Sequence, residues 1–126
     1  ALQNSNTKQS AVKKTMPSVL YNTTVQAKRA LNEKGFDVVT IGSGSTVTKQ
    51  SPVAGEKINE QSRVFILTNG GWKMPRIIGW SKADVQKLCE MTGMKLQSTG
   101  TGYANSQSIN FSQSINGKET LKVNFE

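Results

Sequence analysis

Met16-Pro17-Ser18-Val19 and Met74-Pro75-Arg76-Ile77 are two copies of one opening, and they lie 58 residues apart in the chain. Glycines recur at the same offset, in the pairs Gly35/Gly93, Gly42/Gly100 and Gly44/Gly102. After a deletion of one residue the match continues, with Gln50-Ser51 aligned to Gln107-Ser108 and Ile58-Asn59 aligned to Ile115-Asn116. Internal repeats of this length are typical of modular arrays. The sequence therefore predicts two small tandem modules, which suit a binding or spacing array better than one catalytic cleft.

The composition limits what each module can do alone. A domain of roughly 55 residues buries only about 60% of its unfolded surface and is marginally stable by itself. Apolar residues make up 35% of the chain, which fits thin cores. We therefore expect the two modules to pack compactly against each other.

The chain of 126 residues is basic, with 16 Lys and Arg, 8 Asp and Glu, no histidine and a formal charge of +8. Such a charge favours anionic partners in general. The excess is spread as three charges in residues 1–15, three in 16–73 and two in 74–126, without a basic block. No base-reading motif accompanies it, so nucleic acid is not an expected partner.

Other features exclude several classes of protein. Cys89 is the sole cysteine, so the sequence predicts neither a disulfide framework nor a metal cluster, and no cofactor is expected. No apolar run is long enough to span a bilayer, and no signal-peptide pattern is present. Residues 1–15 are polar and basic and are predicted to form a linker or a disordered arm.

Each module is predicted to hold one helix of about three turns. Thr23 and Ser81 are candidate N-caps, followed three residues later by Gln26 and Asp84. Gly35 and Gly93 are the expected stops, in the left-handed conformation. The apolar helix positions are Val25, Ala27, Ala30 and Leu31 in the first copy, and Val85, Leu88 and Cys89 in the second. On this stripe Cys89 is expected to be a small buried hydrophobe.

Strands are predicted after each helix and at the end of each module. The ranges are 36–41 and 63–68 in the first copy, and 94–98 and 120–125 in the second. With a short or irregular opening strand, each unit becomes β-α-β-β. The predicted class is α+β, with a first module at 16–68, a connection at 69–73 and a second module at 74–126.

This order of elements resembles the PASTA repeat. The resemblance is carried by Pro-x-Val, the capped helix, Gly35-Phe36, the turn Gln50-Ser51-Pro52-x-x-Gly55 and the closing strand. The family is found at the extracellular ends of penicillin-binding proteins and bacterial Ser/Thr kinases. Two repeats closing a chain are similar to the C-terminal region of class B penicillin-binding proteins, most of all the division-associated transpeptidases of staphylococci.

The chain departs from the family pattern at two places. Tyr21 stands where the family usually has glycine, whereas the second copy keeps Gly79. In the second copy the Gln-Ser-Pro turn has become the segment 107–112, which lacks the proline and the last glycine. The resemblance therefore does not imply, for this chain, a way of binding a ligand that requires this turn in both modules.

The resemblance implies a non-catalytic module at the extracellular face of the bacterial envelope. Its partners would be peptidoglycan fragments, either stem peptide or cross-bridge, with other division proteins as further candidates. The transpeptidase domain and a membrane anchor would lie upstream. The alternative function is structural: the modules orient the transpeptidase or dock division proteins and bind no small ligand.

Fragments of catalytic motifs do not change this interpretation. Ser10-x-x-Lys13, Ser108-x-Asn110 and Ser114-x-Asn116 match parts of the penicillin-binding set, but no Lys-Thr-Gly follows. Lone Gly-x-Gly stretches without a following helix are weak phosphate signals. The sequence therefore predicts no enzyme.

Two tryptophans and one arginine are the candidate ligand-binding residues. Trp72 lies in the connection, Arg76 in the second opening and Trp80 just before the second helix. Aromatic faces stack on sugars and peptide planes, and arginine supplies donors to carboxylates or carbonyls. The competing interpretation is that Trp72 and Trp80 fill the interface between the modules, and both hold if one edge stays exposed.

Overall fold

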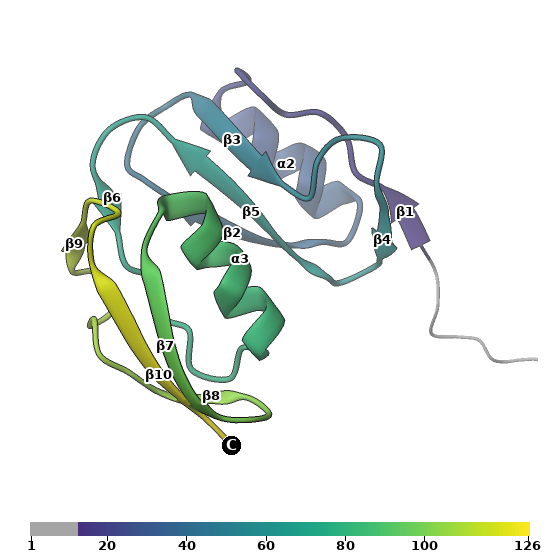
Figure 1. Cartoon of the computed structure of the whole chain (residues 1–126). Coiled ribbons are helices and arrows are strands. Elements are labelled where there is room, and N and C mark those ends of the chain that lie inside the picture. Colours follow the sequence, from purple (N-terminus) through teal and green to yellow (C-terminus); the bar gives the residue numbers. More distant parts are fainter. Residues whose placement is uncertain (1–12) are drawn as a thin grey trace, which may run out of the picture.

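The computed structural model describes residues 13–126, and it contains two modules that repeat one topology (Figure 1). In the first module, helix α2 (Thr24–Glu33) packs on a sheet of β2 (Asp37–Ile41), β5 (Arg63–Thr68) and β3 (Val47–Ser51). The strand order is β2-β5-β3. β2 runs parallel to β5 and β3 runs antiparallel to it, so the last strand of the module lies in the centre.

The second module has the same arrangement. Helix α3 (Lys82–Thr92) is followed by β7 (Lys95–Gly100), β8 (Ala104–Gln107) and β10 (Thr120–Phe125). Their order is β7-β10-β8, again with a parallel and an antiparallel pair around the last strand. The repeat in the sequence is therefore a repeat of topology and strand register.

The structure has more strands than the predicted β-α-β-β order. β3 and β8 fall in segments where no strand was predicted, because each is a polar edge strand with one buried apolar residue, Val47 or Ala104. The short strands are β1 (Lys13–Thr15), β4 (Lys57–Asn59), β6 (Trp72–Lys73) and β9 (Ser114–Ile115). β1 pairs with β4 although its residues were predicted to be linker, and residues 1–12 lie outside the described residues.

The helix ends follow the sequence signals. Thr23 Oγ1 accepts from the Gln26 N–H at 3.1 Å, and Ser81 Oγ accepts from the Asp84 N–H at 3.3 Å. These side chains satisfy amides that the first helical turn leaves free. The chain then leaves each helix through a glycine with φ 87°, Gly35 or Gly93, which confirms both predicted stops.

Two hydrophobic cores hold the modules, and the second extends across the boundary between them. The first core lies between α2 and its sheet and includes Leu31, Val64 and Ile66. Phe65 and Leu67, on the other face of β5, belong instead to the core of the second module. α3 therefore lies between two sheets, its own and that of the first module, as Figure 1 shows.

A glutamine fixes the opening segment of each module. The Gln50 side chain accepts from the Val19 N–H at 2.7 Å and donates to the carbonyls of Pro17 and Pro52. Gln107 accepts from the Ile77 N–H at 3.0 Å and donates to the carbonyls of Pro75 and Ile109. The divergent turn of the second module thus keeps the contacts that organise the fold.

Candidate functional site

An open groove runs between the modules at the β2 edge of the first sheet, with a volume of about 440 Å³. One wall is β2. The other is formed by residues 73–76 and by Phe111 and Ser112 of the second module. Arg63 and Trp80 close the groove between these walls. We call this site the inter-module groove.

Arg63 joins the modules, and it is held by contacts with both of them. Its Nη1 donates to Asp84 Oδ2 at 2.6 Å, and its Nε lies 3.6 Å from Asp37 Oδ2. The guanidinium also lies over the Trp80 ring, 4.7 Å from the centroid. Two carboxylates and an aromatic face therefore hold Arg63 in place.

Trp80 forms a wall of the groove and is only 6% exposed. Its ring packs edge-on against Phe65 of the first module, with centroids 5.6 Å apart and an interplanar angle of 71°. That geometry is favourable for aromatic pairs. Trp80 consequently fills the interface, and only a small edge remains for a ligand.

Trp72 is the one sequence-predicted site residue that does not line the groove. It is half-buried in β6, and its indole N–H donates to the carbonyl of Thr68 at 3.3 Å. The ring lies against Gly42 and Gly117, where an added Cβ would come within 3.2 and 3.4 Å of it. Trp72 therefore secures the junction of the modules but is less buried than the sequence predicted.

Arg76 is a groove cation that stays available, whereas Lys73, which also lines the groove, donates to Ser114 Oγ at 3.2 Å. It is exposed, and it makes no ion pair among residues 13–126. Its guanidinium stacks on the Phe111 ring at 4.9 Å from the centroid, which orients the donors without occupying them. Phe111 is 57% exposed and was not predicted as a site residue. The signal in the sequence was an aromatic residue at the position of Ala54 in the first repeat.

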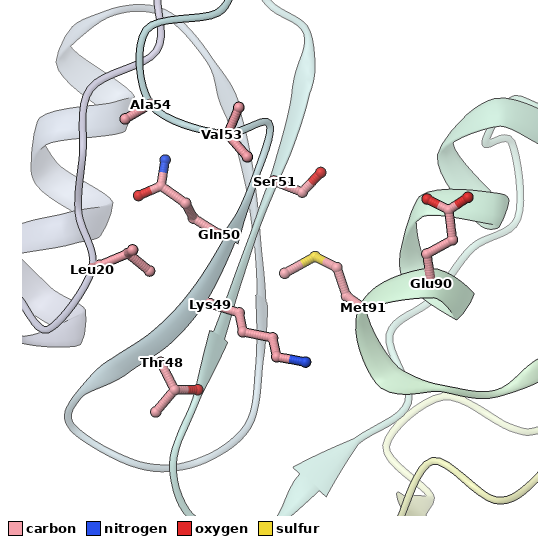
Figure 2. Close-up of a pocket in the computed structure, with 9 residues that line it drawn as sticks. All are labelled: Leu20, Thr48, Lys49, Gln50, Ser51, Val53, Ala54, Glu90 and Met91. Atoms are coloured by element: carbon pink, nitrogen blue, oxygen red, sulfur yellow. The ribbon is translucent and has the colours of Figure 1, made fainter.

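A second groove lies at the opposite, β3 edge of the first sheet and has a volume of about 420 Å³. Figure 2 shows first-module residues such as Leu20 and Val53 facing Met91 of α3 across it. Two of its polar side chains are engaged, because Gln50 holds the opening segment and Thr48 Oγ1 donates to the carbonyl of Leu67 at 3.1 Å. We call it the apolar groove, and it offers fewer oriented polar groups than the inter-module groove.

Other chemistry finds little support in the described part of the chain. Residues 13–126 contain no cluster of three or more side chains suited to a metal ion. Burial, with a smaller effect of Glu90, raises the pKa of the Cys89 thiol to about 11, so the reactive thiolate is disfavoured. Among the described helices, none has the length and apolar character needed to cross a bilayer.

Comparisons with known proteins agree with this picture. Residues 14–70 match the family model described as the PASTA domain. Penicillin-binding protein 2X from Streptococcus thermophilus matches over 91% of this chain with 19% identity and a TM-score of 0.79. The match spans 17% of that protein, so the likeness concerns the fold of a small part of it.

Two kinase structures from Staphylococcus aureus also match. The three-PASTA-domain structure of a Ser/Thr kinase is 17% identical over 90% of this chain and 65% of its own, with a TM-score of 0.39. The extracellular region of the Ser/Thr kinase PrkC is 18% identical over 92% of this chain and 47% of its own, with a TM-score of 0.38. No curated protein matches the chain.

Proposed function

We propose that the two modules, the first of which matches the PASTA domain over residues 14–70, form a non-catalytic unit that binds or positions peptidoglycan. In this proposal residues 16–68 and 74–126 are the modules, and 69–73 connect them. The unit works on the extracellular face of a bacterial envelope and belongs to a division-associated transpeptidase. The catalytic domain and the membrane anchor of that protein lie upstream.

The observation that carries the proposal is the exposed Arg76 guanidinium stacked on Phe111 at the inter-module groove. A cation that is held over an aromatic ring and makes no ion pair within residues 13–126 suits the carboxylates and carbonyls of a stem peptide or cross-bridge. We assign the contacts to Arg76, Phe111 and the exposed edge of Trp80. Trp72 packs at the junction of the modules and takes no part in these contacts.

Binding at this groove is expected to be weak. The groove is open, whereas good small-molecule pockets bury most of their ligand. A Kd poorer than about 10 μM, or a free energy weaker than roughly −7 kcal/mol, follows from so little enclosure. Such affinity suits a module that meets many copies of its ligand in the wall.

The test is a titration of the labelled protein with a soluble muropeptide, followed by amide chemical shifts. Saturable shifts are expected at residues 73–76, Phe111 and β2. Arg76→Ala and Phe111→Ala should each weaken binding about fivefold or more, as loss of one charged or stacking contact predicts. Arg29→Ala is the matched control, because it removes the same charge from the exposed side of α2. Shifts confined to the apolar groove would refute the location.

A structural role is the second candidate, and the shared core favours it. α3 packs against both sheets, and Arg63 bridges to Asp84, so the pair is one rigid unit that could orient a transpeptidase or dock division proteins. In that case no muropeptide shifts would appear at millimolar concentration. An oligonucleotide titrated in parallel reports whether the basic charge alone attracts anions.

A further inference from the structure

β2 is an edge strand, and its free edge faces the inter-module groove. The sheet order β2-β5-β3 gives β2 one partner, β5, within residues 13–126. The Asp37 N–H donates to the carbonyl of Ser62 at 2.9 Å, with Asp37 in register with Arg63. In a parallel pair alternate residues bond to the neighbour, so Asp37, Val39 and Ile41 face β5. The N–H and C=O groups of Val38 and Thr40 therefore point away from the sheet.

Those outward groups are reachable. Val38 and Thr40 line the groove and are only half-buried. Proteins usually protect an exposed strand edge with prolines, bulges or covering segments. β2 contains no proline, and its pairing with β5 has no register shift. Its one charged residue, Asp37, lies at the first position and is paired with Arg63.

The facing wall is held in place and leaves positive charge in the groove. Met74 exchanges main-chain hydrogen bonds with the second-module loop, through Gln113 O and Ser112 N–H, both at 2.8 Å. Its own polar groups are therefore satisfied. Arg76 on this wall has no ion-pair partner among the described residues, whereas Asp37, a carboxylate that lines the groove, is paired with Arg63.

We propose that the inter-module groove binds an extended peptide as an additional strand along β2. The peptide main chain bonds to Val38 and Thr40, and a peptide carboxylate lies on Arg76. Addition of a strand to a free sheet edge is a general mode of peptide recognition, with affinity from main-chain hydrogen bonds. The inference rests on the proposed function for the wall origin of the peptide, and it specifies the class of ligand and the way it is recognised.

The probe is a glycine pentapeptide with a free carboxylate, because it presents main-chain groups without side chains. Amide shifts should map to Val38–Thr40 and Arg76. A pentamer of N-methylglycine has no main-chain N–H donors and should bind at least about tenfold more weakly, the loss expected for two or more hydrogen bonds. Pentaglycine amide lacks the terminal carboxylate and should bind several-fold more weakly to the wild type but equally to Arg76→Ala.

Thr40→Pro and Ser98→Pro form a matched pair of variants. Ser98 holds the same register position on β7, which is also an edge strand. Each substitution removes an outward N–H and keeps the ladder bonds, since proline is tolerated on edges at such positions. Thr40→Pro should abolish pentaglycine binding and Ser98→Pro should leave it unchanged. Thermal unfolding of both variants reports whether they fold. If they do not fold, the comparison of pentaglycine with its N-methylated form on the wild-type protein still tests the proposal.

The outcomes separate the two proposals. Equal binding of pentaglycine and its N-methylated form, or no binding of either at millimolar concentration, overturns strand addition. Muropeptide shifts at Arg76 in the same sample would leave the proposed function standing. If pentaglycine binds with the expected pattern while muropeptides do not bind, the peptide groove is real and the wall-binding function is wrong.

Discussion

The two modules share one topology but treat the outer face of the sheet in opposite ways. In the first module that face is apolar and covered by α3, with Val39, Ile41, Phe65 and Leu67 in the shared core. The residues in the same register of the second module are Gln97, Thr99, Lys122 and Asn124. These side chains are exposed or half-buried. One backbone plan thus serves either as an interface or as a solvated surface, according to four side chains.

The two helices differ in the side chains that they carry on the corresponding stripe. The stripe of α3 that faces the first sheet carries Asp84, Leu88 and Met91, with Asp84 bound to Arg63 and Met91 lining the apolar groove. The same positions of α2 hold Gln26, Ala30 and Glu33. Repeat arrays need polar outer faces on the units that end a stack. Neither α2 nor the second sheet therefore offers another copy of the interface seen between these modules.

The largest effect is expected when a residue on the outer face of the first sheet is replaced by the residue that the second sheet has at the same position. Phe65→Lys places a charge in a fully buried position, which lies in the most destabilising class of substitutions. We expect a loss of at least about 4 kcal/mol in unfolding free energy and separation of the modules, measured by urea unfolding and scattering. The reciprocal Lys122→Phe should change stability by less than about 0.5 kcal/mol. Equal effects of the two would contradict the comparison.

Removal of the ionic bridge is the next largest expected effect. Arg63→Thr copies the residue at the equivalent register position, Thr120, and leaves Asp84 without its partner. Loss of a partly buried pair together with a cation–π contact should cost about 2 kcal/mol. Urea unfolding measures the loss, and Thr120→Ala is the control that should be neutral. A neutral Arg63→Thr would mean that apolar packing alone holds the interface.

The two glutamines provide a test in which the modules should behave alike. Gln50→Ala and Gln107→Ala each remove three hydrogen bonds, two to the opening segment and one to the turn that follows the strand. Each variant should lose about 2 kcal/mol of unfolding free energy, since half-buried main-chain groups are left without partners. A much smaller loss for Gln107→Ala would show that the divergent turn has taken over its role.

The sequence predicted the features that depend on local signals, and it missed those that depend on contacts between distant segments. The repeat, the two caps and the glycine stops are local signals, and the structure confirms them. β3 and β8 were missed because their residues are mostly polar, and their strand form comes from pairing with β5 and β10. The site could be predicted only in part. Arg76 and Trp80 meet in the groove, whereas Phe111 depends on how the modules pack, which no local pattern specifies.

Residues in the left-handed backbone conformation differ between the modules, and a smaller effect on stability is expected when they are exchanged. Tyr21 has φ 66° where the second module has Gly79 with φ 91°, and Ser112 has φ 74° where the first has Gly55 with φ 90°. A residue with a Cβ costs about 1–2 kcal/mol in this conformation. Gly79→Ala and Gly55→Ala should therefore destabilise by about 1 kcal/mol, whereas Tyr21→Gly and Ser112→Gly should be neutral or stabilising. Thermal unfolding of the four variants checks this, and destabilisation by Tyr21→Gly would contradict it.

The smallest expected effect concerns acid stability and one carboxylate of the second module. Burial acts to raise the pKa of Glu119, but hydrogen bonds from the main-chain N–H groups of Asn116 and Gly117 outweigh it and lower the pKa from its ordinary value of 4.5. A folded pKa below the unfolded one means that the ionised group favours the folded state. This contribution is present above the unfolded pKa and is lost as the pH falls through the folded pKa. The first module has Ser62 at this position and therefore has no carboxylate that could make the same contribution.

Carbon-detected NMR of the Glu119 carboxyl gives the pKa, and the amide shifts of Asn116 and Gly117 should titrate with it. Glu119→Gln should lower stability slightly at neutral pH, and its difference from the wild type should shrink in acid, because protonated Glu119 resembles glutamine. The effect is small since the group is almost fully solvated and its charge is screened. A Glu119 pKa at or above the ordinary value would show that these hydrogen bonds do not hold the loop in solution.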